Sequence, residues 1–137
     1  MILADTSAWV EYDRATGSAV DTRMTELIAI EGLLAVTEPV AMEVLAGARS
    51  EAREAELRRL LGRFTLLGVD AVADFEGAAR IYRGCRAAGV TPRNLVDCLI
   101  AAVARRRGAA LLASDVDLER VARVVGIQLD DASSGGG

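Results

Sequence analysis

The first seven residues indicate the fold class, and they read Met1-Ile2-Leu3-Ala4-Asp5-Thr6-Ser7. An apolar run this short is typical of a buried strand. Asp, Thr and Ser, which follow at once, begin helices, because their side chains accept hydrogen bonds from the free amides of the first turn. The segment therefore predicts a strand followed directly by a helix, which is the repeating unit of parallel sheets.

The rest of the chain repeats this pattern of short apolar runs between helical segments. Further strands are predicted over residues 33–36, 64–69 and 109–113, with a fifth over 127–129. Helices are predicted over 7–14, 18–31, 38–47, 51–61, 71–88, 95–107 and 117–125. Because strands and helices alternate, we expect a three-layer α/β/α fold with a central parallel sheet of four to five strands.

Length and composition indicate one domain in the cytoplasm. The 137 residues suit one domain over 1–130, followed by a flexible tail over 131–137 that ends Ser133-Ser134-Gly135-Gly136-Gly137. The longest apolar run, 99–104, is far below the ~20 residues of a membrane span. No secretory signal is visible at the N-terminus. Cys85 and Cys98 are too few for a disulfide framework, so free thiols and a cytoplasmic location are expected.

The composition also excludes several catalytic mechanisms. The chain has no histidine and no lysine, so all 16 basic residues are arginine. Histidine-based triads, histidine-ligated zinc, Schiff-base chemistry and Walker A loops are therefore excluded. The net charge of −4 argues against a protein that coats nucleic acid by bulk electrostatics. Carboxylates, hydroxyls, arginine and a bound metal ion remain available for catalysis.

Four carboxylates stand among apolar neighbours. Asp5 and Asp115 follow predicted strands, Glu43 is the only charge in residues 39–46, and Asp97 lies in an apolar helix. A carboxylate removed from water is costly unless it is paired, protonated or bound to a metal. In open parallel sheets, ligands bind outside the carboxyl ends of the strands. Four carboxylates that converge there predict an oxygen-ligand site for Mg²⁺ or Mn²⁺.

Each of these aspartates also has a structural interpretation. Asp5 can cap the first helix, and Asp97, three residues after Asn94, can form a variant of the capping box. Asp115 and Asp117 can be ordinary loop and cap residues. These interpretations do not exclude a metal site.

Because the chain has no lysine, a buried carboxylate can form an ion pair only with an arginine. The alternative to a metal-site role for Glu43 is therefore an ion pair with a buried arginine. The arginines of 105–107 end a helix, where cations are favoured by the helix dipole. Arg93 and three arginines at helical spacing are suited either to holding phosphates or to a solvated face; the three are Arg80, Arg83 and Arg86.

Together, four segments resemble the PIN domain family, and most closely the VapC-type toxins of toxin–antitoxin pairs. The segments are 2–9, Glu43, 94–102 (Asn-Leu-Val-Asp-Cys-Leu-Ile-Ala-Ala) and 114–118 (Ser-Asp-Val-Asp-Leu). They occur in the order and at the spacing of the family, from residue 1 to about 130. The resemblance implies a PIN-like fold and a Mg²⁺-dependent endoribonuclease, with Mn²⁺ as a substitute, that a cognate VapB-type antitoxin inhibits.

The family's site residues transfer onto matching positions of this chain. The resemblance implies that the catalytic, metal-binding quartet is Asp5, Glu43, Asp97 and Asp115, with Asp117 as an accessory ligand. A hydroxyl of Thr6 or Ser7 would orient the first aspartate or a metal-bound water. Because the chain is acidic and lacks lysine, its contacts with RNA must rest on a few arginines, for which Arg86 and Arg93 are candidates.

The expected chemistry is phosphodiester hydrolysis by one or two ions held by carboxylates. Asp5, Asp97 and Asp115 are assigned to the metal, and Glu43 to the attacking water or to a second ion. Receiver domains and haloacid-dehalogenase-type phosphatases are excluded, because both need a lysine. The alternatives are a metal-dependent DNA nuclease and a non-catalytic PIN-like nucleic-acid-binding module. We further expect a homodimer, since two-fold pairs are the commonest assembly.

Overall fold

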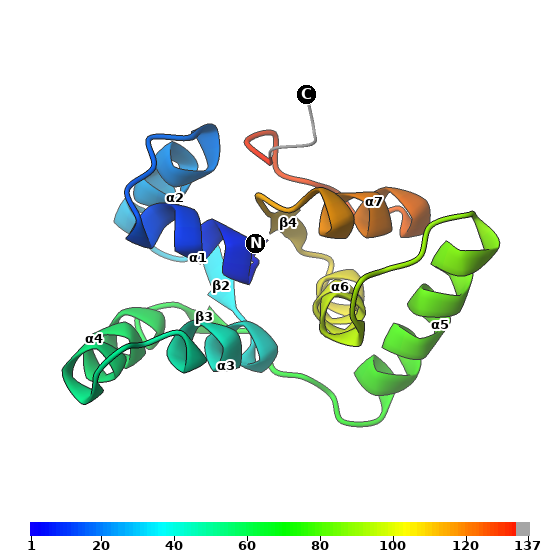
Figure 1. Cartoon of the computed structure of the whole chain (residues 1–137), viewed down its shortest axis with the longest axis horizontal. Helices are drawn as coiled ribbons and strands as arrows, with labels where there is room; N and C mark the ends of the chain where they lie inside the picture. Colours follow the sequence, from blue (N-terminus) through cyan, green and yellow to red (C-terminus); the bar gives the residue numbers. More distant parts are fainter. Residues whose placement is uncertain (134–137) are drawn as a thin grey trace.

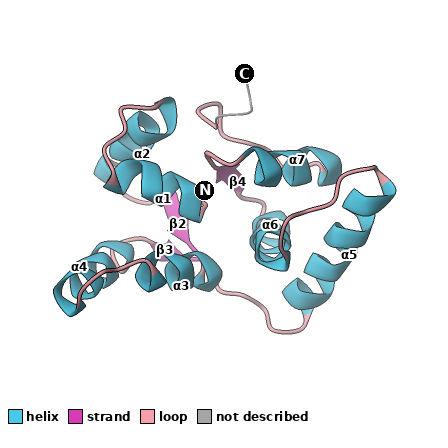
Figure 2. Ribbon diagram, in the orientation of Figure 1, coloured by secondary structure: helices cyan, strands magenta, loops and turns pink. Residues whose placement is uncertain are grey.

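A computed structural model describes residues 1–133 of the chain. Its sheet has four parallel strands, β1 (Ile2–Ala4), β2 (Leu34–Val36), β3 (Thr65–Leu66) and β4 (Ala110–Leu112). The helices are α1 (Thr6–Asp13), α2 (Ala19–Ala29), α3 (Glu38–Ala46), α4 (Glu51–Leu61), α5 (Ala73–Ala87), α6 (Leu95–Arg107) and α7 (Val116–Val125). Figure 2 shows the short strands at the centre, with helices around them. The predicted α/β/α fold with a parallel sheet is confirmed.

The strand order, β3-β2-β1-β4, explains where a site can form. The chain steps outward from β1 to β3 and then crosses to β4, on the other side of β1. Ile2 of β1 therefore pairs with Leu34 on one side and with Ala110 on the other. In Figure 1, α1 and α2 lie on one side of the strands, and α5 and α6 on the other. The strand order reverses at β1 and β4, and a crevice at their carboxyl ends is the usual ligand site.

The ends of several elements differ from the prediction. Strand β3 has only two residues of the expected 64–69, and it is the exposed edge strand of the sheet. The expected fifth strand is a single parallel bridge between Leu111 and Leu129. Helix α5 begins at Ala73 instead of 71, because the Asp70 carboxylate accepts hydrogen bonds from the amides of Val72 and Ala73. These differences do not move the strand ends that face the predicted site.

Helix α6 is buried and is fixed to α5 by an ion pair. Seven of its residues are buried, including Cys98, which packs as a small core residue as expected. From its exposed end, Arg106 donates two hydrogen bonds of 2.8 Å to the buried carboxylate of Asp74. These hydrogen bonds lower the pKa of Asp74 below its ordinary value, although burial opposes them. Of the three arginines that end α6, Arg106 therefore forms a structural ion pair, in addition to the favourable position of all three cations at the end of the helix.

Residues 131–133 differ from the flexible tail that the composition predicts. Ser133 is buried, its hydroxyl accepts a hydrogen bond from the Ala113 amide at 3.2 Å, and it donates to the Leu111 carbonyl at 3.3 Å. These bonds fix this part of the chain beside β4. The rest of the predicted tail, 134–137, lies outside the described residues. Of the helices in residues 1–133, none is long and apolar enough to cross a membrane.

Candidate active site

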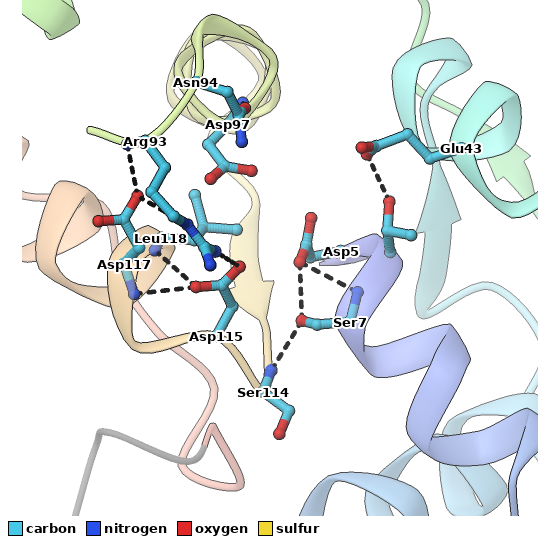
Figure 3. A network of polar contacts seen from close by, with 11 residues as sticks. Asp5, Ser7, Glu43, Arg93, Asn94, Asp97, Ser114, Asp115, Asp117 and Leu118 are labelled. Carbon is cyan, nitrogen blue, oxygen red and sulfur yellow. Dashed lines mark hydrogen bonds and ion pairs between the residues drawn. The ribbon is translucent and has the colours of Figure 1, made fainter.

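The four predicted carboxylates line one cavity at the carboxyl ends of the strands. The cavity has a volume of about 370 Å³, and Figure 3 shows the polar contacts around it. Asp5 lies at the end of β1, Glu43 in α3, Asp97 in the first turn of α6, and Asp115 between β4 and α7. Segments that are far apart in the sequence thus meet at the point where the strand order reverses.

Asp5 both caps α1 and faces the cavity, so its two interpretations are compatible. Its carboxylate accepts hydrogen bonds from the Ser7 amide at 3.1 Å and from the Ser7 hydroxyl at 2.7 Å. The residue is only 3% exposed. Burial raises the pKa of Asp5, and the hydrogen bonds from Ser7 oppose that rise. Asp5 is therefore a buried acid whose orientation is fixed by its own helix.

The two hydroxyls after Asp5 hold different parts of the site. The Ser7 hydroxyl also accepts a hydrogen bond from the Ser114 amide at 2.9 Å, so it joins the start of α1 to the end of β4. The Thr6 hydroxyl donates to the Glu43 carboxylate at 2.7 Å. The partner of Glu43 is thus the Thr6 hydroxyl and not the buried arginine that the sequence left open as an alternative. Ser7 orients Asp5, and Thr6 orients Glu43.

Asp97 lies in an environment that disfavours its negative charge. Asn94 caps α6 by accepting a hydrogen bond from the Asp97 amide at 2.9 Å. The residue is 6% exposed, and within residues 1–133 its buried Oδ2 has no hydrogen-bond partner. Burial, followed by repulsion from Asp5, Asp115 and Asp117, raises the pKa of Asp97 from 3.8 to about 7. The positive charge of Arg93 partly opposes this rise in the pKa of Asp97.

Asp115 and Asp117 hold an arginine between them. Asp115 caps α7 through the amides of Asp117 and Leu118, and its other oxygen accepts a hydrogen bond from the Arg93 guanidinium at 2.7 Å. Asp117 accepts a hydrogen bond from the Arg93 backbone amide at 2.9 Å and lies 3.8 Å from its Nε. Asp117 lies beside the cavity and is not among the residues that line it.

The structure separates the two candidate phosphate contacts and adds one acidic residue. Arg93 lines the cavity, whereas Arg86 lies on α5 with its guanidinium 5.7 Å from the centre of the Tyr82 ring and does not line it. Glu11 also lines the cavity, although the sequence did not single it out. It stands four residues after Ser7 on α1, and this helical spacing is the signal that could have found it.

The chemistry of the cavity suits a hard divalent cation. All its candidate ligands are carboxylate oxygens, and the buried Oδ2 of Asp97 has no other partner in residues 1–133. As the side chains stand, no three histidine, cysteine, aspartate or glutamate residues within that part of the chain form a ligand group. Mg²⁺ commonly binds through one or two carboxylates and keeps several water ligands, so it does not need three protein ligands in place.

A second groove of about 410 Å³ adjoins the acidic cavity and shares Thr6, Val10 and Glu43 with it. It lies between α1, α3 and α4. Its floor is apolar, with Trp9 and Leu61 buried, and the arginines that line it are Arg14, Arg49 and Arg53. Asp13 also lines the groove and is paired with Arg53, so the acidic cavity opens beside an apolar surface with charges of both signs.

Comparison with known proteins matches the chain to the PIN domain family over residues 2–124. The chain is 46% identical over 129 residues to VapC ribonuclease Mb1587 of Mycobacterium bovis, covering 93% of this chain and 96% of that protein. Ribonuclease VapC11 of Mycobacterium tuberculosis gives the same identity and coverage.

Solved structures share the fold at low identity. VapBC2 of Rickettsia felis, bound to a DNA fragment from its promoter, has a TM-score of 0.74 at 18% identity, covering 95% of this chain and 98% of that chain. DNA-bound VapBC of Salmonella typhimurium has a TM-score of 0.72 at 21% identity, covering 94% and 96%. The family match over residues 2–124, together with the 46% identity to the two VapC ribonucleases, shows that the chain belongs to the PIN domain family, among the VapC ribonucleases.

Proposed function

We propose that this protein is the toxin of a VapBC-type toxin–antitoxin pair and that it is a Mg²⁺-dependent endoribonuclease. The observation that carries this proposal is the meeting of Asp5, Glu43, Asp97 and Asp115 in one cavity at the carboxyl edge of the sheet. The relatives at 46% identity are named VapC ribonucleases, which supports RNA as the substrate.

A bound divalent ion would neutralise the phosphate, lower the pKa of a water molecule and stabilise the leaving oxygen. Asp5, Asp97 and Asp115 are the residues that would hold it, with Asp117 as the accessory ligand, and Mn²⁺ is the expected substitute. Asp97 suits this role because its buried carboxylate repels its acidic neighbours and lacks a hydrogen-bond partner for Oδ2. A dication would relieve that repulsion.

The remaining polar residues would orient the reacting groups. Glu43, fixed by the Thr6 hydroxyl, would accept a hydrogen bond from the attacking water or hold a second ion. Ser7 keeps Asp5 in place through the hydroxyl bond and ties it to β4 through Ser114. Arg93 is the cation at the cavity that would contact the phosphate of the RNA strand.

A VapB-type antitoxin is the proposed partner. Several solved structures of the same fold are toxin–antitoxin complexes, including those of Klebsiella pneumoniae and Haemophilus influenzae. We propose that a segment of the antitoxin covers the acidic cavity and so excludes RNA from it.

The function is tested by incubating the purified protein with defined RNAs and with DNA strands of the same sequences. Each reaction is run with EDTA, with Mg²⁺ and with Mn²⁺, and cleavage is followed on denaturing gels. We expect cleavage of RNA only, and only with a divalent ion. Cleavage of the DNA would favour a DNA nuclease. Binding of RNA without cleavage under every condition would favour the non-catalytic binding module.

A further inference from the structure

Arg93 is the only side-chain cation among the described residues that line the acidic cavity, and its guanidinium is bound to two of the site's carboxylates. One of its nitrogens lies 2.7 Å from Asp115 Oδ2, and its Nε lies 3.8 Å from Asp117 Oδ2. Figure 3 shows the guanidinium between these two carboxylates, on the side of the cavity where Asp97 also lies. A positive charge thus already occupies part of the space that serves a divalent cation.

The carboxylates do not depend on this guanidinium for their positions. Asp115 is also held by the backbone amides of Asp117 and Leu118, at 2.9 and 3.4 Å. Asp117 is held by the backbone amide of Arg93 at 2.9 Å, and any residue at position 93 except proline would keep this bond. Removal of the guanidinium would therefore leave both acids anchored.

The guanidinium is also free to leave. The Arg93 side chain is 64% exposed, whereas the side chains of Asp115 and Asp117 are 19% and 17% exposed. Ion pairs with an exposed partner contribute little to stability, because water screens them and the long side chain loses entropy. Rotation of Arg93 into solvent is therefore inexpensive, and the carboxylates that it leaves keep their backbone contacts.

From these contacts we propose that Arg93 is a built-in counter-ion of the acidic site, which a divalent cation must displace from Asp115 and Asp117 before these carboxylates can bind it. In the metal-free protein the guanidinium reduces repulsion among the acids. When an ion binds, the like charge of the guanidinium opposes it, and Arg93 moves away from the pair. The proposal rests on the proposed metal-dependent function.

The proposal is tested by titrating Mg²⁺ alone into the full chain and measuring its dissociation constant by calorimetry. Arg93→Gln removes the competing charge and keeps the backbone amide, so it should bind Mg²⁺ about threefold to tenfold more tightly than the wild type. Arg93→Lys keeps the charge and should stay within about twofold of the wild type. Arg83→Gln, an exposed site on α5 that does not line the cavity, makes the same change in net charge and should also stay within about twofold.

Equal or weaker Mg²⁺ binding by Arg93→Gln would overturn the proposal, as would equal tightening by Arg83→Gln. Absence of Mg²⁺ binding by every variant would overturn it together with the proposed metal dependence. If only the results for Arg93→Gln or Arg83→Gln contradict the proposal, the metal-dependent function stands, because the wild type still binds Mg²⁺. If Arg93→Gln does not fold, Arg93→Ala is titrated in its place, with the same tightening expected and the same results counting against it.

Discussion

At the scale of single residues, Asp97 should make the metal-free protein less stable as the pH rises. Its pKa is raised from 3.8 to about 7 in the folded state, mainly by burial. Between these values the folded protein binds a proton that the unfolded chain has released, so stability falls from about pH 4 to about pH 7. Each unit of pKa difference corresponds to about 1.4 kcal/mol. Asp97→Asn removes this effect, so in EDTA the variant should melt above the wild type at pH 8 and near it at pH 4.5.

Thermal melts of both proteins across this pH range, in EDTA and in Mg²⁺, measure the effect. Mg²⁺ should raise the melting temperature of the wild type more than that of Asp97→Asn. A variant that melts lower than the wild type in EDTA, by the equivalent of about 0.5–2 kcal/mol, and responds equally to Mg²⁺ would make Asp97 a structural cap. The structure favours the first result, because Asn94, and not the Asp97 side chain, caps α6.

The same carboxylates should be required for cleavage. Asp5→Asn and Asp97→Asn replace charged ligands by neutral amides, which bind a hard dication poorly. We expect each variant to lose more than about 90% of RNA cleavage at saturating Mg²⁺ while it keeps its far-ultraviolet circular dichroism spectrum. Asp21→Asn, a substitution in α2 outside the cavity, is the control and should cleave RNA like the wild type. Retention of activity by both site variants would show that the site is wrong.

Sequence alone predicted most of this site. Asp5, Glu43, Asp97 and Asp115 were identifiable because each carboxylate has apolar neighbours and lies near a strand end or in a buried helix, and the structure brings them together. Their roles in metal binding and catalysis stay predictions. The contacts of Arg93 with Asp115 and Asp117 depend on the path of the loop that precedes α6. Local sequence does not encode that path, so these contacts could not be predicted.

At the scale of elements, Ser7 should couple stability to metal binding. Its hydroxyl is bonded to Asp5 and to the Ser114 amide, so Ser7→Ala leaves that amide without its partner and loosens the junction of α1 with β4. We expect a loss of about 1–2 kcal/mol in the free energy of unfolding. We also expect weaker Mg²⁺ binding, because Asp5 keeps only its backbone bonds.

Ser50→Ala is the matched control for this substitution. Ser50 caps α4 through the Arg53 amide and does not line the cavity, so its loss should cost a similar amount of stability and leave Mg²⁺ affinity unchanged. Denaturant unfolding and calorimetry measure the two quantities. Equal effects of both variants on Mg²⁺ affinity would contradict a positioning role for Ser7.

Elements were predicted well where local signals are strong and less well where distant contacts decide. Helix α6 has the predicted bounds, since Asn94 caps its start and Gly108, with a φ of 64°, ends it. Strand β3 is shorter than its apolar run, because it pairs with β2 alone at the sheet edge. Similarly, the segment after α7 touches β4 at one bridge only, so no fifth strand extends from it.

At the scale of the whole molecule, the protein should form a homodimer. Several large apolar side chains are more than half exposed, among them Met42, Phe75 and Leu95 at 58%, 57% and 61%. Burial of such side chains between two copies would remove apolar surface from water. Light scattering coupled to size exclusion should give twice the mass of the 14.4 kDa chain at micromolar concentration. A monomer at every concentration would contradict this prediction.

A cognate VapB-type antitoxin should inhibit cleavage by binding over the acidic cavity. The cavity offers Asp5, Glu43, Asp97 and Asp115, so a basic segment is the complementary occupant, and the apolar groove beside it can hold neighbouring apolar residues of that segment. Because a basic side chain and a dication would compete for the same carboxylates, the complex should bind Mg²⁺ at least tenfold more weakly than the free toxin. Calorimetry with Mg²⁺ and RNA cleavage at increasing antitoxin test both effects. A stable complex that still cleaves RNA and binds Mg²⁺ as tightly as the free protein would place the antitoxin elsewhere on the surface.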